Sequence, residues 1–279
     1  MRCRWIGAAL VAATLTAHAS QPAASTAPAP AWPPSPITDH LALDGIFFYG
    51  HVSTTGTFNA NAGTPGTPFS AEQDLGLTDR AVQPQIELMA RLENRWRFRF
   101  DFLDLRRQGN AVPTEDIQFG NQLYVAGLPV QSEIDWRQTD FTYTYSFLRN
   151  SRFELGAGLG IHLIQTEATA SSPNSPERSD YSAAGPFATI ALDGTWRIAR
   201  HWSFNARGQY FRVAVKTGNG ALGVYHADVQ YRWRPNLALG LGYQYELVEL
   251  QVEHSNPNEL NGSVRLKITA PEFFVRLSL

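Results

Sequence analysis

The stretch from Val82 to Phe102 constrains the fold most, because it alternates between two chemically different faces and turns in the middle. Apolar side chains occupy every second position up to Leu92 and again from Trp96, and mostly polar side chains lie between them. A period of two places the two sets on opposite faces of a sheet. The stretch therefore predicts a hairpin that turns around Asn94. In a soluble sandwich its apolar face would meet a second sheet, whereas in a transmembrane barrel it would meet lipid.

The first 19 residues have the organisation of a secretory signal. Arg2 and Arg4 precede an apolar segment, which ends before the small-residue sequence Ala17-His18-Ala19. The segment is too short to cross ~30 Å of hydrocarbon as a helix. The only cysteine, Cys3, lies inside this signal, so the mature chain is expected to contain neither a disulfide nor a thiol site.

Composition separates a linker from one large domain. Residues 20–38 are rich in Ala and Pro and lack periodicity, which predicts a disordered linker before a single domain at 39–279. Charged residues make up only 17% and aromatic residues 12% of the chain, which is unusual for a soluble surface. The balance of 23 basic and 25 acidic residues argues against nucleic acid as a partner. No run of 18 apolar residues follows the signal, so the apolar surface must be spread over alternate positions of many strands.

Alternating segments follow the hairpin as far as the last residue, and we count ten strands, with eight or twelve as alternatives. Short connections near Asn94, Asn150, His201 and Pro235 alternate with longer ones, as in transmembrane barrels. Aromatic side chains gather beside the short connections, where a girdle would meet one lipid interface. They are Trp96, Phe147, Phe153, Trp196, Trp202 and Trp233. The two longest loops are expected at 57–80 and 106–131. The pattern predicts an all-β, antiparallel, up-and-down transmembrane barrel.

Several short motifs occur in order along the chain. They are Asp74-Leu75-Gly76-Leu77, Arg95-Trp96-Arg97, Leu105-Arg106-Arg107-Gln108-Gly109, Ile117-Gln118-Phe119-Gly120, Gly127 with Val130 and Ser132, and Tyr143-Thr144-Tyr145. This ordered set resembles a proteobacterial family of small, porin-like outer-membrane β-barrel proteins without assigned function. The resemblance implies an exported protein with one barrel in the outer membrane, and it carries no catalytic residue across. The partners expected at that address are the lipid bilayer, lipopolysaccharide and the barrel-assembly machinery.

Charged and histidine side chains of one phase are expected to point into the barrel. They are Glu87, Arg91, Arg97, Arg99, Asp101, Glu154, His162, Asp193, Arg197, Arg207, His226, Asp228, Arg232, Glu246 and Arg276. Barrels of about eight strands are only wide enough for side chains, and aqueous channels need about 16. The expected protein is therefore a monomer with a lumen largely filled by ion pairs of mixed sign, structural or weakly transporting. We expect neither enzyme activity nor a cofactor nor a metal site.

Three other functions stay open. An envelope hydrolase or protease would use a histidine with a carboxylate, and His226 shares a face with Asp228 as His162 does with Glu154, but the required third group is not evident. A narrow pore or small-ligand barrel would use space left by inward glycines, although such glycines also accommodate bulky neighbours. They are Gly156, Gly158, Gly160, Gly240 and Gly242. Finally, the long loops could carry adhesion or partner binding.

Overall fold

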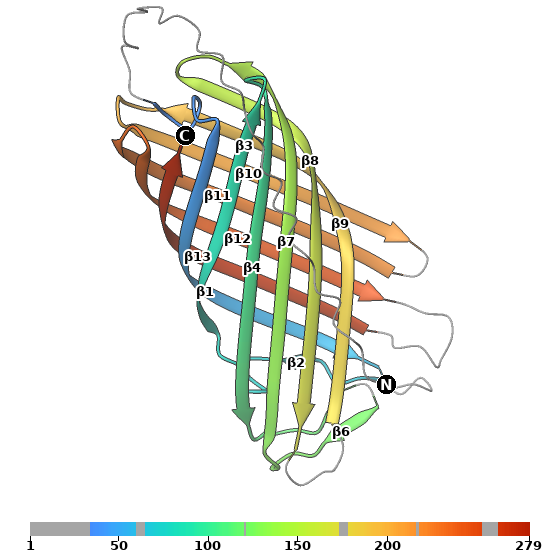
Figure 1. Ribbon diagram of the computed structural model, residues 1–279. Helices are drawn as coiled ribbons and strands as arrows, with labels where there is room; N and C mark the ends of the chain where they lie inside the picture. Colours follow the sequence, from blue (N-terminus) through green and yellow to red (C-terminus); the bar gives the residue numbers. More distant parts are fainter. Residues whose placement is uncertain (1–33, 60–64, 120, 173–177, 216–217, 253–261) are drawn as a thin grey trace, which may run out of the picture. The chain divides into compact units, whose positions relative to one another are not determined.

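The computed structural model describes residues 34–59, 65–119, 121–172, 178–215, 218–252 and 262–279. Within these ranges, ten long antiparallel strands form one sheet that closes on itself (Figure 1). They are β1 (Leu41–Phe58), β3 (Arg80–Leu92), β4 (Trp96–Ala111), β7 (Val130–Arg149), β8 (Phe153–Ser171), β9 (Arg178–Arg197), β10 (Trp202–Val215), β11 (Gly218–Arg234), β12 (Leu237–Val252) and β13 (Gly262–Ser278). Three short strands complete the set: β2 (Phe69–Ser70) pairs with β1, and β5 (Ile117–Phe119) pairs with β6 (Gln122–Tyr124).

The barrel closes through its first and last strands. β1 pairs with β13 from Ala42 opposite Ser278 to Phe58 opposite Gly262. The backbone N–H groups of His40 and Leu41 donate to the terminal carbonyl of Leu279, which fixes this seam at its end. The prediction of a ten-stranded barrel is confirmed, and the sandwich and the counts of eight and twelve are wrong. No helix in the described part of the chain is long and apolar enough to cross a membrane.

The hairpin predicted around Asn94 is present. β3 and β4 pair from Leu92 opposite Trp96 onward, and the connecting residues Glu93 and Asn94 both have positive φ, at 48° and 64°. Two positive φ angles in a tight turn match the twist of the strands that it joins. The predicted faces are also correct, since Val82 is 66% exposed while Glu87 is 2% exposed.

The outer surface of each strand changes character along its length. On β8, apolar side chains face outward from Phe153 to Leu163, and Gln165 and Glu167 follow in the same phase. A span of this length matches the ~9–11 residues that cross a bilayer as a tilted strand. We call the end with the short turns the inner end, because such turns lie on the periplasmic side of outer-membrane barrels. The strands therefore extend well beyond the lipid at the outer end.

The inner surface changes in the opposite direction at the same level. On β4, Arg97, Arg99 and Asp101 point inward, whereas the next inward residues are Leu103 and Leu105, 3% and 1% exposed. The barrel therefore has a membrane-type half with a polar interior and a water-exposed half with an apolar interior. The same strands supply both halves: the alternation of inward and outward positions continues, and the apolar side chains pass from the outward to the inward positions where lipid ends.

The aromatic residues predicted to form a girdle do lie next to the inner turns and face outward. Phe147 is 56% exposed, Trp196 and Trp202 are each 46% exposed, and Trp233 is 61% exposed. Trp96 stacks on Tyr143 of β7, with ring centroids 5.0 Å apart. This position suits amphipathic rings at a lipid–water interface.

The expected strand ends are corrected at the outer side. The loop predicted at 106–131 is shorter, because β4 continues to Ala111 and β7 begins at Val130. β1 ends at Phe58, so it overlaps the loop predicted at 57–80 by only two residues. Strand was expected only where apolar residues face outward, and this criterion fails above the membrane.

The predicted signal and residues 20–33 of the predicted linker lie outside the described residues. The remaining linker residues, 34–38, differ from a disordered chain, since they form a turn in which Ser35 and Ile37 are 3% and 2% exposed. The backbone N–H of Thr38 donates to the carbonyl oxygen of Ser35 at 2.8 Å. The ordered domain therefore begins before the predicted boundary at residue 39.

Candidate functional site

The inner end of the barrel is blocked by residues 35–39, which we call the inner stopper. Arg91 and Arg149 donate side-chain hydrogen bonds of 2.7–3.2 Å to its backbone carbonyl oxygens. Arg232 Nη2 lies 2.5 Å from a carboxylate oxygen of Asp39, which also accepts a hydrogen bond from a hydroxyl of the last strand. Guanidinium groups from three separate strands therefore hold this short segment.

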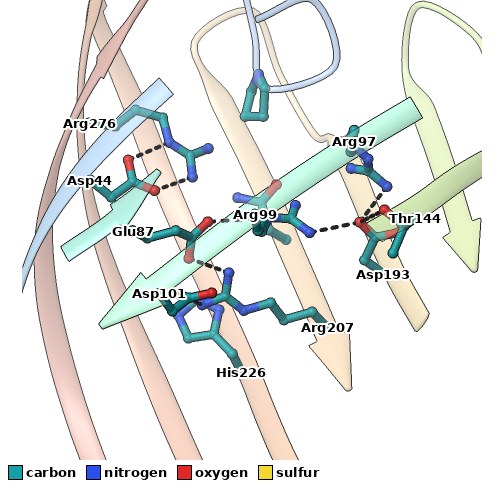
Figure 2. Close-up of polar contacts among 12 residues, drawn as sticks. Asp44, Glu87, Arg97, Arg99, Asp101, Thr144, Asp193, Arg207, His226 and Arg276 are labelled. Carbon is teal, nitrogen blue, oxygen red and sulfur yellow. Dashed lines mark hydrogen bonds and ion pairs between the residues drawn. The ribbon is translucent and has the colours of Figure 1, made fainter. Parts of the chain in front are cut away.

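Above the stopper, acidic and basic side chains meet in the middle of the lumen. Arg99 lies between two carboxylates, with Nε 3.2 Å from Glu87 and Nη1 3.0 Å from Asp193 (Figure 2). Arg207 forms an ion pair with Glu87, and Arg97 forms one with Asp193. The two carboxylates are at most 4% exposed. Each buried charge thus has opposite charges beside it, which buried charges require.

Two further pairs extend this layer around the barrel. Arg276 holds both carboxylate oxygens of Asp44 at 2.7 and 2.5 Å, and Gln230 accepts from the same guanidinium at 3.1 Å. His226 of β11 pairs with Glu272, which lies on β13 as Arg276 does. We call the groups of these two paragraphs, together with Asp101 and Asp228, the polar plug.

A third pair ties the plug to the stopper. Arg91 presents two N–H groups to Glu154, at 2.5 and 2.9 Å. Ser146 donates to the same carboxylate at 2.5 Å, and Arg97 Nη1 lies 3.6 Å from it. Glu154 is fully buried at 0% exposed. Because Arg91 also binds the stopper, the two features form one continuous network.

The structure places the residues that phase predicted for the lumen inside the barrel. Most are buried; Arg99 and Arg207 are partly exposed, with side-chain exposures of 15% and 18%. Sequence reasoning missed several of their partners, namely Asp39, Asp44, Asp140 and Glu272. Asp44 could not be assigned because both faces of its strand carry large apolar residues. The inward position of Glu272 could have been predicted from the alternation, because it lies on the opposite face from Phe273 and on the same face as Phe274.

Only one of the two histidine–carboxylate pairs suggested by the sequence is present. His162 does not meet Glu154; its Nδ1 lies 2.7 Å from Asp140 and its Nε2 lies 2.8 Å from Gln209. His226 Nδ1 is 3.6 Å from Asp228, and its Nε2 contacts Glu272. Both rings are buried, with both nitrogens beside a protein group. The described ranges also hold no cluster of His, Cys, Asp and Glu that could bind a metal ion.

The inward glycines leave little free space. A Cβ at Gly156 would collide with Asp193 and Arg97, and one at Gly242 would lie 2.6 Å from Glu272. A Cβ at Gly240 would collide with the ring of Phe274. These glycines make room for bulky neighbours, which favours the simpler of the two explanations considered for them.

The interior above the plug is an apolar cavity of about 260 Å³, which we call the outer chamber. Its wall comes from strands on several sides of the barrel, and it includes Leu105, Trp136, Ile164, Phe187, Leu250 and Leu266. The indole N–H of Trp136 donates to Gln138 at 3.2 Å, and Gln138 donates to Asp140 at 2.9 Å. Trp136 therefore lines the chamber, while its N–H begins a chain of hydrogen bonds that leads to Asp140.

The outer loops cover part of this chamber. Phe69, Leu75 and Leu77 of the β1–β3 connection line it together with Phe119 of β5. One charged side chain, Arg107, reaches the wall, and its Nη1 is ion-paired with Glu72 at 2.6 Å. The backbone is packed closely here, because a Cβ at Gly109 would collide with the backbone of Gly76.

A wider open hollow of about 740 Å³ lies at the outer ends of the strands. It shares Phe69, Leu250 and Val264 with the chamber, so the two spaces adjoin. Neither the chamber nor this hollow was expected from the sequence. The sequence contained one sign of the chamber: Leu103 and Leu105 occupy the same inward positions as the charged residues that precede them.

Comparison with known proteins supports the fold. No protein-family model matches the chain, and no curated protein matches it. The resemblance to a proteobacterial barrel family therefore stays a prediction. Among solved structures, the outer-membrane protease OmpT of Escherichia coli is 12% identical with a TM-score of 0.57, over 87% of this chain and 98% of that chain. The transport unit of the autotransporter AIDA-I from Escherichia coli (9% identity, TM-score 0.42, 86% of this chain and 90% of that chain) and Ail, the attachment invasion locus protein of Yersinia pestis (10%, 0.30, 85% and 99%), also match. At such identities the likeness establishes the fold alone: this chain folds as an outer-membrane β-barrel.

Proposed function

We propose that this protein binds a small apolar molecule in its outer chamber and does not conduct through its lumen. The observation that carries the proposal is the apolar cavity of about 260 Å³ directly above a plug of ion pairs. The outer half of the barrel would thus bind a ligand, and the lumen of the inner half would be filled by side chains.

The size and lining of the chamber favour binding. An apolar cavity of ~150 Å³ in another protein stays dry and accepts benzene, so the larger chamber has room for a small aromatic molecule or a hydrocarbon chain. The hydroxyl of Ser132 at the wall already donates to the carbonyl oxygen of Leu75 at 2.8 Å. Arg107 donates to Thr54 at 2.5 Å and pairs with Glu72. The Ser132 hydroxyl and both terminal nitrogens of Arg107 are thus occupied, and within these two side chains only the Nε of Arg107 lacks a partner. Apolar contact is therefore the main attraction.

The inner half offers no comparable space. The cavities among the plug residues measure about 30, 20 and 10 Å³. A single water needs roughly 10–15 Å³ of such volume. Spaces of this size suit isolated waters rather than a continuous aqueous path. The inner stopper adds a second obstruction below them.

An enzyme is the less favoured function. A histidine that acts as a general base needs a free nitrogen within reach of substrate, and His162 and His226 have both nitrogens beside buried protein groups. The protease OmpT shares the fold at 12% identity. That level carries no catalytic residue to this chain.

Contact quenching of Trp136 tests the proposal, because this residue lines the chamber and is 5% exposed. The mature protein is refolded into lipid vesicles with Trp136 as its only tryptophan, and bromobenzene is titrated from the aqueous phase. The other mature-chain tryptophans become phenylalanine: Trp32, Trp96, Trp196, Trp202 and Trp233. We expect quenching that saturates, as binding at one site requires.

Two substitutions on β8 provide the comparison. Ala168→Phe fills the chamber from its wall and should abolish the saturable quenching. Glu167→Phe adds the same ring to the outward face and should leave it unchanged. Folding of each variant is checked by its heat-dependent shift on a semi-native gel. Quenching that rises linearly without saturation, or that persists in Ala168→Phe, would contradict the proposal.

A further inference from the structure

The barrel wall is incompletely hydrogen-bonded between β9 and β10. Their ladder runs from Ser203 opposite Arg197 to Tyr210 opposite Ile190, and the described residues form no pair beyond this point. β9 nevertheless continues to Arg178, paired with β8 alone, and β10 continues to Val215, paired with β11 alone. In Figure 1 the two strands diverge towards their outer ends. The backbone ladder of the wall therefore has a lateral gap on this side, which we call the opening.

The opening begins beside the apolar outer surface. Ile190 and Tyr210, the last pair of the ladder, are 67% and 49% exposed and face lipid. On the neighbouring β8, the outward residues stay apolar as far as Leu163, which lies opposite Pro186 and thus beyond Ile190. On β10 the next outward residue, Arg212, is charged and exposed. The opening thus starts within the outer part of the apolar band and extends beyond it.

The free edge of β9 is also a wall of the outer chamber. Ala184, Gly185 and Phe187 line the chamber, and all three lie on β9 beyond the end of the ladder. A Cβ at Gly185 would meet no atom within 4 Å, so the space beside it is open. Pro186 lies between them and has no N–H to donate, which suits an edge that is not paired. The unpaired part of β9 therefore forms part of the chamber wall.

We propose that the opening between β9 and β10 admits an acyl chain of an outer-leaflet lipid into the outer chamber. This inference rests on the proposed binding function and specifies its ligand. Three observations favour a lipid chain: the opening lies beside outward apolar residues, the chamber is apolar, and Arg107, its one charged wall residue, is ion-paired with Glu72. A headgroup would stay outside, near Arg212, while the chain lies inside.

A reversible cross-link tests the route. Ala188 and Arg212 are the outward positions that would pair next if the ladder continued, and Cys3 in the predicted signal is the only cysteine of the chain. The variant Ala188→Cys/Arg212→Cys is prepared with Trp136 as its only tryptophan, in vesicles containing phospholipid brominated on its acyl chains. We expect Trp136 to be quenched in the reduced protein, to lose this quenching when a short cross-linker joins the cysteines, and to regain it when a cleavable linker is cut.

The control keeps the same cysteine on β9 and joins it to the other neighbour. In Ile161→Cys/Ala188→Cys both positions are outward and already opposite each other in the β8–β9 ladder. Cross-linking here should leave the quenching by brominated lipid unchanged. Because each comparison is made within one folded sample before and after cross-linking, a folding defect cannot imitate the effect.

The outcomes separate this inference from the proposed function. Quenching by brominated lipid that survives closure of the β9–β10 opening would mean that the chain arrives through the outer hollow, and the lateral route would be wrong. Saturable binding of bromobenzene without any quenching by lipid would overturn the lipid ligand while leaving the proposed function intact. Absence of both signals would overturn the proposed function and, with it, this inference.

Discussion

Glu87 illustrates how the lumen tolerates many charges. Its side chain is 3% exposed and lies between Arg99, at 3.2 Å, and Arg207. Taking a carboxylate out of water is costly, and the cost is offset only by close opposite charges. Arg99 in turn reaches Asp193 at 3.0 Å, so the removal of one carboxylate leaves more than one guanidinium with reduced compensation.

Glu87→Gln should therefore destabilise the barrel strongly. Breaking a buried pair by removing one partner costs about 3–5 kcal/mol. The free energy of unfolding, measured by urea titration in lipid vesicles, should fall by about this amount. The matched control is Glu249→Gln, whose carboxylate lies 3.2 Å from Arg265 in a pair that is 47% and 58% exposed. That change should cost less than about 1 kcal/mol. Equal effects of the two substitutions would mean that the plug contributes no more than a surface pair.

At the scale of single residues, the sequence predicts which side chains point into the barrel. It does not predict which groups they pair with. Phase alone places Glu154 and His162 inside the barrel, and both are 0% exposed. Their partners, Arg91 and Asp140, come from other strands, and the contact depends on the relative register of those strands. Register is set by turns and by the closure of the barrel. Neither can be read from a single strand.

At the scale of the element, a strand consists of two segments whose apolar side chains lie on opposite faces. On β4 the outward side chains pass from Phe102 to Asp104, while the inward ones pass from Asp101 to Leu103. The membrane-spanning segments could be predicted because lipid demands apolar side chains on the outward face. The outer segments have the opposite pattern, typical of a barrel in water, and a search for outward apolar residues therefore predicts loops there.

Arginine substitutions at two outward positions of β8 should locate the level at which the outer surface passes from lipid to water. Leu159 is 65% exposed and lies well within the apolar band, so Leu159→Arg should cost about 2–4 kcal/mol of folding free energy. Gln165→Arg, on the same face but beyond the band, should cost between about 0 and 1 kcal/mol. Refolding into vesicles at a series of urea concentrations provides the measurement. A large cost at Gln165 would mean that lipid extends further out than Leu163. The lateral opening would then lie deeper in the lipid than inferred.

At the scale of the whole molecule, the cavities among the charged side chains of the inner half are small, and the outer half holds a larger apolar one. The sequence predicts a lumen filled by side chains, because ten strands enclose little more than their own side chains. It did not predict the outer chamber, whose wall depends on apolar residues that arrive from many strands at one level. Loop residues such as Leu75 and Leu77 complete the chamber, and their inward packing follows from tertiary contacts.

Planar-bilayer recordings test whether the inner half of the barrel conducts ions. The stopper and the plug obstruct the lumen in series, so the refolded mature protein should show no conductance steps. Removal of residues 20–38, which takes away most of the stopper, should leave the bilayer silent because the plug cavities are no larger than about 30 Å³. The triple variant Glu87→Ser/Arg99→Ser/Arg207→Ser removes the central side chains of both signs and should produce small steps when combined with that deletion. Steps in the unmodified protein would instead require the plug to rearrange spontaneously. A pore would then be the better description of the molecule, and the apolar chamber would be a constriction along it.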